Sequence, residues 1–203
     1  GEVANDPALG HHFKMYMTEY ARGEPEVHRD YVNGMAKKST WLDIATSGAD
    51  QLRQRVAWSL MQIIVIGEGG VGDYTISEPY LTYYDILVRH ALGDFHSLLR
   101  EVAFSPVMAR YLTYLGSRGH VAAGTYPDEN FAREVMQLFS IGLWKLNMDG
   151  TQQHDGAGQP IPTYDNDDIM DFSRAWTGFD LQAPRGNLEH FFGDTSENMV
   201  DPM

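Results

Sequence analysis

One predicted helix carries the polar side chains best suited to chemistry. Apolar residues at helical spacing predict an amphipathic helix over residues 127–143. The opposite face of this helix carries a polar stripe, made of Asn130, Arg133, Glu134 and Gln137. If the stripe lines a cleft, the Glu134 carboxylate can transfer a proton while Arg133 and Asn130 orient a polar substrate such as a saccharide. Glu134 is therefore a candidate catalytic residue.

A second pair of candidate residues, Arg89 and His90, ends another predicted helix. In the functional interpretation, His90 is the acid/base partner of Glu134, and Arg89 belongs to the same polar network between the two helices. In the structural interpretation, both side chains complement the negative C-terminal end of their own helix dipole. The sequence leaves both interpretations open.

Helix stability also explains part of the polar stripe. Glu129 and Arg133 stand four residues apart, which suits an ion pair on a helix surface. Asp128 and Glu129 suit the positive N-terminal end of the helix dipole. The functional alternative makes this whole set part of a polar binding site. The candidate binding residues are then Arg89, Asp128, Glu129, Asn130, Arg133 and Gln137.

Residue spacing gives less support to other chemistries. Eight histidines allow a metal-binding protein, but no pair has zinc-enzyme spacing on one helix, so we assign no metal ligand and no cofactor. The glycines of residues 67–72 match a dinucleotide-binding pattern, but no helix is expected directly after them. We interpret this run as a helix stop followed by a loop. The absence of cysteine excludes disulfides and thiolate sites.

Composition limits the partners of the chain. Its 203 residues are 43% hydrophobic, which is enough to bury a core. The formal net charge of -13 repels phosphate backbones and anionic lipid, so we expect no nucleic-acid partner. The longest strongly apolar run, residues 56–66, is too short to span a membrane.

Helix signals dominate the chain and predict a mainly α fold. We expect one domain over residues 1–203, with about seven helices. They are predicted at residues 6–23, 50–66, 77–92, 94–102, 105–115, 127–143 and 165–176. Residues 23–47 give a mixed signal, with room for a short helix around 31–35. Since nearly every position from Val56 to Ile66 is apolar, that half of its helix is expected to be buried all round.

The C-terminal third gives different signals. Two Asp-Gly dipeptides predict a short β-hairpin around residues 144–164. Asp165 and Asp168 have the spacing of a carboxylate capping box at the start of the following helix. Residues 179–203 are expected to form an acidic, loop-like tail. Because the chain starts at glycine and stops without a closing element, we expect a fragment of a longer protein.

Several segments together resemble a known family. The most specific is PDENFAREVMQLFSIGL at residues 127–143, and shorter ones lie at 48–57, 89–95, 147–151, 160–164 and 175–179. In this order and at these separations they resemble the bacterial and algal family called domain of unknown function eighteen hundred, over residues 41–179. The matching positions include the polar stripe and the pair Arg89 and His90.

The resemblance implies a mostly helical, longer protein that is exported or lies at the cell surface. No activity is established in that family, so no catalytic role carries over to this chain. We therefore expect an extracytoplasmic helical module that acts by binding or assembly. Its partner would be another protein or the remaining parts of its own longer chain. The alternatives are an enzyme with a carboxylate and histidine site around Glu134 and a metal-binding protein.

Overall fold

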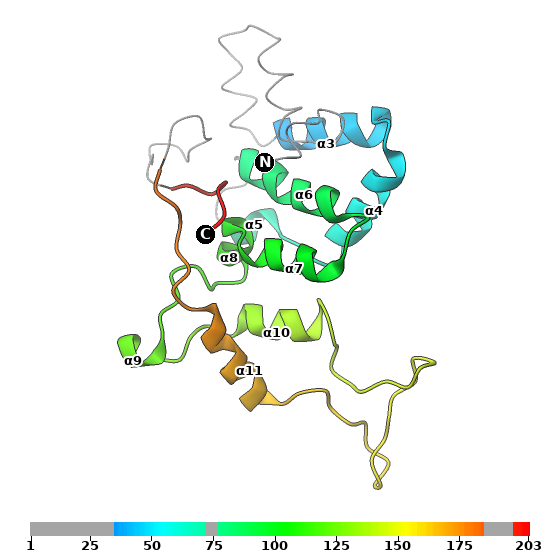
Figure 1. The fold of residues 1–203 in the computed structure, drawn as a ribbon, viewed down its shortest axis with the longest axis vertical. Helices are drawn as coiled ribbons and strands as arrows, with labels where there is room; N and C mark the ends of the chain where they lie inside the picture. Colours follow the sequence, from blue (N-terminus) through cyan, green and yellow to red (C-terminus); the bar gives the residue numbers. More distant parts are fainter. Residues whose placement is uncertain (1–34, 72–76, 185–196) are drawn as a thin grey trace, which may run out of the picture. The chain divides into compact units, whose positions relative to one another are not determined.

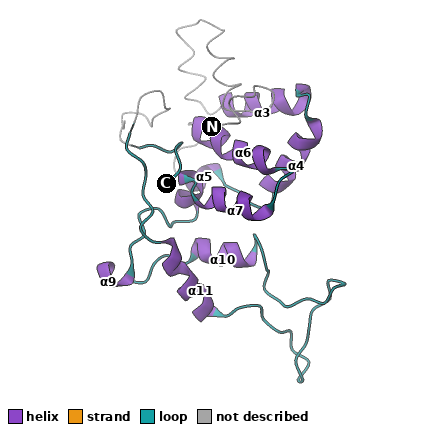
Figure 2. Cartoon of the chain, in the orientation of Figure 1, coloured by secondary structure: helices purple, strands orange, loops and turns teal. Residues whose placement is uncertain are grey.

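The computed structural model describes residues 35–71, 77–184 and 197–203. Helices and loops make up these described residues, and no strand occurs among them (Figure 2). The α-helices are α3 (Met35–Ser47), α4 (Gln51–Met61), α5 (Glu68–Val71), α6 (Glu78–His90), α7 (Phe95–Ala103), α8 (Pro106–Tyr111), α9 (His120–Ala123), α10 (Asn130–Gln137) and α11 (Asn166–Ser173). The predicted mainly α class is confirmed, with nine α-helices in the described part against about seven expected.

The chain divides into two compact units (Figure 1). Unit 1 contains the described residues of 1–111 and 181–203, and unit 2 contains residues 112–180. The expected single domain stays a prediction. The helix expected at residues 6–23 and the short one around 31–35 fall on residues 1–34, which lie outside the described residues.

Helix α6 forms the centre of unit 1, where it packs against α3, α4, α7 and α8. It begins after Ser77 with Pro79 in its first turn, as its sequence predicts. Apolar and aromatic side chains then fill most of its length, and Tyr83, Leu87 and Val88 are almost fully buried. A helix that is apolar on nearly all sides needs neighbours on nearly all sides, which explains its central place.

The sequence signals did not reveal α3, because polar residues occupy its buried face. Lys37 and Thr40 are both buried, and Ile44 follows on the same side of the helix. Lys37 places its ammonium 4.5 Å from the centre of the Tyr80 ring on α6. Such a cation–π contact stabilises a buried lysine that a hydrophobic pattern cannot reveal.

Helix α4 is shorter than predicted, and the expected burial of its second half is wrong. The helix ends at Met61, and the chain continues to Ile66 without helical structure. Ile64 and Ile66 are buried while Ile63 and Val65 are exposed. The chain leaves the helix through turns in which the N–H groups of Ile63 and Ile64 both donate to the Leu60 carbonyl, so the apolar face of the helix is not continued.

An aromatic cluster forms the core of unit 2. The ring of Phe131 on α10 stacks on Tyr114 with centroids 4.3 Å apart. Trp176 meets Phe131 edge to face at 4.7 Å, and Phe172 of α11 meets Trp176 at 5.5 Å. Helices α10 and α11 therefore pack through rings, in geometries that aromatic pairs favour.

Helix α10 spans eight residues, where the sequence predicted helix over residues 127–143. It starts only after Asp128, whose carboxylate accepts a hydrogen bond from the Asn130 backbone N–H at 2.9 Å. At the other end, Gly142 adopts a φ of +75° and its N–H donates to the Met136 carbonyl at 2.8 Å. This left-handed glycine redirects the chain after the end of α10.

The β-hairpin predicted around residues 144–164 is wrong in form. The segment contains isolated antiparallel bridges, such as Trp144 with Pro162 and Leu146 with Gln152, but no strand. The Lys145 N–H donates to the Ile161 carbonyl, and the Lys145 carbonyl accepts from the Gln153 N–H. The hydrogen bonds of residues 143–147 are thus divided between two partner segments, so no continuous two-stranded ladder forms.

Two helix caps and part of the tail agree with the sequence. Asp165 accepts from the Asp167 and Asp168 N–H groups and donates its own N–H to the Asp168 carboxylate, so the capping box is confirmed. Asp94 caps α7 through the Ser97 N–H. The described parts of the tail, 179–184 and 197–203, contain no helix, although Asn198 is buried in unit 1.

Candidate functional site

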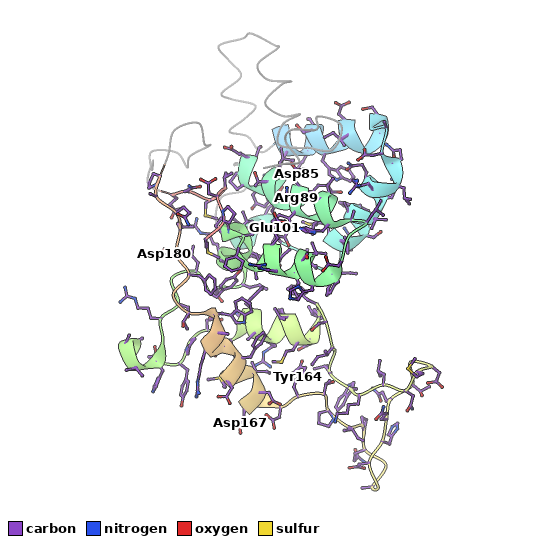
Figure 3. The ribbon with its side chains drawn as sticks, viewed as in Figure 1. Asp85, Arg89, Glu101, Tyr164, Asp167 and Asp180 are labelled. Carbon is purple, nitrogen blue, oxygen red and sulfur yellow. The ribbon has the colours of Figure 1, made fainter. Side chains whose placement is uncertain are left out.

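Arg89 and His90 both bind a carboxylate that the sequence analysis missed. They end α6, and Glu101 lies on the neighbouring helix α7 (Figure 3). Arg89 pairs with Glu101 through Nη2 and donates from Nε to Oε2 at 3.3 Å. His90 Nε2 lies 2.5 Å from the same Oε2 atom. Arg89, His90 and Glu101 thus form a polar network between α6 and α7, whereas the predicted network joined Arg89 or His90 to the Glu134 stripe.

The pairing of His90 with Glu134 stays a prediction. His90 belongs to unit 1, whereas Glu134 belongs to unit 2. Glu101 could not be selected from the sequence, because an acidic residue in an amphipathic helix is usually a solvated one. Only the packing of α6 against α7 brings it to Arg89 and His90.

Two of the four stripe side chains, Arg133 and Asn130, have local partners in unit 2. Arg133 forms the expected ion pair with Glu129 one turn earlier. Asn130 donates from Nδ2 to the Thr113 hydroxyl at 2.8 Å, and its backbone N–H donates to the Asp128 carboxylate. Gln137 is the half-buried last residue of the helix. These contacts stabilise the helix and hold Asn130 and Arg133 in fixed positions.

Glu134 differs from its neighbours on α10. Its Oε2 atom is buried and makes no hydrogen bond within the described part of the chain. The same is true of the Tyr164 hydroxyl, which lies in the same unit (Figure 3). Burial raises the pKa of Tyr164, the positive charge of Arg133 lowers it, and the negative charge of Glu134 raises it further. Arg133, Glu134 and Tyr164 therefore form one electrostatically coupled group, which we call the unit 2 polar cluster.

The glycine-rich run has a packing role in unit 1. Residues 68–71 of the run form the short helix α5 in place of the expected loop. A Cβ atom built on Gly70 would lie 2.4 Å from Cδ2 of Tyr111 on α8. Gly70 is therefore required by the close approach of an aromatic ring. Gly69 has nothing within 4 Å of such an atom.

A large cavity in unit 1 was not predicted. It has a volume of about 530 Å³ and lies between side chains of α3, α4 and α6, with contributions from Ile66 and Glu68. Trp41 and Trp58 pack together in its wall with ring centroids 4.7 Å apart. Sequence reasoning missed the cavity because α3 itself was missed.

Two negative findings apply only to the described part of the chain. Across residues 35–71, 77–184 and 197–203, no group of three or more His, Asp or Glu side chains is arranged to hold a metal ion. Over the same ranges, no helix combines the length and the apolar character that a membrane span requires.

The family of the chain follows from its sequence pattern. The pattern of DUF1800, a family of proteins of unknown function, matches residues 4–203. The chain belongs to this family. The match extends well beyond residues 41–179, over which the resemblance was first noted. No curated protein and no solved structure matches the chain.

Proposed function

We propose that this DUF1800 chain is a binding or assembly module of an exported or cell-surface protein. It would contact another polypeptide, either a partner protein or a further part of its own chain. One observation carries the proposal: a run of exposed apolar side chains in unit 2, which we call the apolar run. Its members, with their exposed fractions, are Leu138 56%, Ile141 53%, Leu143 45%, Trp144 38%, Leu146 53% and Met148 105%.

The apolar run differs from ordinary surface apolar residues by its density. Single exposed apolar side chains are normal on folded proteins and need no partner. Here six large ones occur within eleven consecutive positions. Concentrated apolar surface of this kind is typical of interaction sites.

The backbone under the apolar run is held in place, which supports a preformed surface. The N–H of Thr163 donates to the Leu143 carbonyl at 3.0 Å, and its hydroxyl donates to the Gly142 carbonyl at 2.7 Å. Lys145 donates its N–H to Ile161 at 2.9 Å. A surface fixed in this way loses little conformational entropy on binding.

Footprinting of the protein in its native setting tests this function. Hydroxyl radicals should modify Trp144 and Met148 readily in the purified chain, because both side chains are exposed. In intact cells of the source organism, the same two residues should be protected at least fivefold. Tyr126 is the matched control, because it is 55% exposed and lies outside the apolar run. Equal reactivity of Trp144 and Met148 in the two settings would refute the proposal.

A second candidate function is an enzyme acting on a polar substrate at the unit 2 polar cluster. It is favoured by the two buried oxygen atoms, Glu134 Oε2 and the Tyr164 hydroxyl oxygen, that have no described partner. Buried polar atoms are normally hydrogen-bonded, so a ligand hydroxyl that bonds to both would complete the site. Glu134 would then accept a proton, and Tyr164 would donate one.

Saccharide turnover distinguishes the second function from the first. Glu134→Gln and Tyr164→Phe should each reduce hydrolysis of a soluble polysaccharide at least 100-fold. Asp171→Asn should keep most of the activity, because its exposed ion pair with Arg174 lies outside the unit 2 polar cluster. No turnover by the unaltered chain on any polysaccharide of a broad panel would exclude this candidate.

A further inference from the structure

We propose that the cavity in unit 1 binds an amphiphilic carboxylate, an acyl chain that ends in a single anionic group. This inference goes beyond the proposed function, because it concerns the other unit and a small molecule. It rests on three properties of the cavity: its size, its apolar wall and the charges of its lining.

The size of the cavity suits a small molecule. Its volume of about 530 Å³ lies within the range of roughly 300–1,000 Å³ that is usual for ligand sites. Three separate helices, α3, α4 and α6, supply most of the wall, so the cavity depends on tertiary packing. Its lining includes Trp41 and Leu42 from α3, Trp58 and Met61 from α4, and Leu81 and Tyr84 from α6.

The wall is mainly apolar and reaches the surface. Leu42 is 56% exposed and Trp58 is 44% exposed, although both side chains line the cavity. Met61 and Leu81 add flexible aliphatic surface, and methionine adapts readily to a chain of varying shape. A long apolar ligand would remove this surface from water, which is the main source of affinity in such a site.

Two polar side chains in the wall, Tyr80 and Lys37, are engaged with neighbouring groups. The Tyr80 hydroxyl donates to the backbone carbonyl of Glu68 at 2.9 Å. The face of the Tyr80 ring meets the Lys37 ammonium at 4.5 Å. A neutral polar ligand such as a sugar would have to break these contacts, whereas an acyl chain would leave them intact.

The charges in the lining favour an anionic end group. Among the described residues of the lining, Lys37, Lys38 and Glu68 are charged, and both lysines lie near the Glu68 carboxylate. Lys38 Nζ lies 3.8 Å from Glu68 Oε2, which is too long for a hydrogen bond, and its side chain is 60% exposed. This local excess of positive charge occurs in a chain whose net charge is -13. A ligand carboxylate at Lys38 would gain a charge-assisted hydrogen bond without leaving water completely.

Calorimetric titration of the whole chain with dodecanoate, below its micellar concentration, tests the inference. We expect saturable binding at one site per chain. Dodecanol should bind at least fivefold more weakly, and dodecylammonium weaker still, because the ligand's end group meets Lys38. Lys38→Glu should reverse the order of dodecanoate and dodecylammonium. Equal affinity for the three end groups would overturn the assignment of a carboxylate.

Two exposed leucines provide a matched pair that locates the site. Leu42→Asp should weaken dodecanoate binding at least tenfold, because it places a negative charge in the lining. Leu52→Asp should leave the affinity unchanged, because Leu52 is 69% exposed on α4 and is not part of the lining. Neither substitution removes a buried side chain, so both variants should fold. Equal effects of the two substitutions would overturn the inference.

A brominated acyl chain gives an independent location. Bromine quenches nearby tryptophans, so 11-bromoundecanoate should quench part of the fluorescence of the unaltered chain. The Trp58→Phe variant should lose that quenched part. Trp144→Phe is the control, because Trp144 is similarly exposed at 38% but lies in unit 2. Quenching that persists in Trp58→Phe and disappears in Trp144→Phe would place the ligand on the apolar run and overturn the inference. Absence of any binding would do the same.

Discussion

Glu101 Oε2 lies 2.5 Å from His90 Nε2, and the same carboxylate also pairs with Arg89. Three partly buried ionisable groups thus join the end of α6 to α7. The contact gives both helices a fixed register, because the Arg89 guanidinium and the carboxylate are planar and share more than one contact.

Replacement of Glu101 tests the strength of this network. Glu101→Gln should lower the free energy of unfolding by about 1–3 kcal/mol, because the partly buried Arg89 and His90 side chains lose their charged acceptor. Chemical denaturation measures the change. Asp171→Asn is the control, since its pair with Arg174 is well exposed and should contribute less than about 1 kcal/mol. Similar losses in both variants would show that the Glu101 network is only a surface contact.

A pair of adjacent glycines tests the packing of α5. Gly70→Ala should destabilise unit 1 by about 1–3 kcal/mol, because the new methyl group would overlap the Tyr111 ring. Gly69→Ala should be neutral or stabilising by up to about 1 kcal/mol, because its Cβ meets open space and alanine favours a helix. Thermal unfolding of the two variants distinguishes these outcomes. The reverse order would contradict the close approach of Tyr111.

Truncation of Phe131 tests the aromatic core of unit 2. Phe131→Ala should cost about 3–5 kcal/mol, because the ring is fully buried between Tyr114 and Trp176. Phe95→Ala should cost far less, because that ring is 44% exposed at the start of α7. Near-ultraviolet circular dichroism should change strongly only in the first variant. An intact spectrum in Phe131→Ala would show that the ring cluster does not define the core.

The titration of Tyr164 tests the unit 2 polar cluster. Burial and Glu134 hold its pKa above the ordinary value of 10.0, against the opposing effect of Arg133. Glu134→Gln should therefore lower this pKa, and Arg133→Gln should raise it. Carbon-13 NMR of labelled tyrosine, assigned with Tyr164→Phe, measures the shifts. Unchanged titration in both variants would separate Tyr164 from the cluster.

The same shift predicts a pH dependence of stability. The folded state holds the Tyr164 proton more tightly than the unfolded chain does. The contribution of Tyr164 to the free energy of unfolding is therefore fully present below pH 10. The contribution should be lost as the pH rises from that value through the higher folded pKa. Tyr164→Phe should remove this part of the alkaline loss, as measured by denaturation between pH 9 and pH 11.

Local signals in the sequence determined several elements correctly. Apolar periodicity with Ser77 and Pro79 predicts α6, and aspartate caps predict the starts of α7 and α11. These features succeed because a helix start depends on hydrogen bonds between residues three or four positions apart. The specific segment at residues 127–143 also identified the family correctly.

Tertiary packing decided what local signals could not. The buried Lys37 of α3 is stabilised by Tyr80, which lies 43 residues later in the sequence. No local sequence pattern therefore predicts that helix. Helix α10 ends at Gln137, where the N–H groups of Leu138 and Phe139 both donate to the Glu134 carbonyl, although the apolar pattern continues beyond it. In both cases a contact or backbone conformation, rather than the apolar periodicity of the sequence, determines where the helix forms or ends.

The candidate site shows the same division. The sequence by itself determined the family, the mainly α class and the residue types able to do chemistry, because composition and periodicity are properties of the chain. Only the tertiary structure paired Arg89 and His90 with Glu101 and formed the cavity between α3, α4 and α6. The physical reason is that ion pairs and cavities depend on distances between elements, and those distances are set when apolar faces from separate parts of the chain pack together.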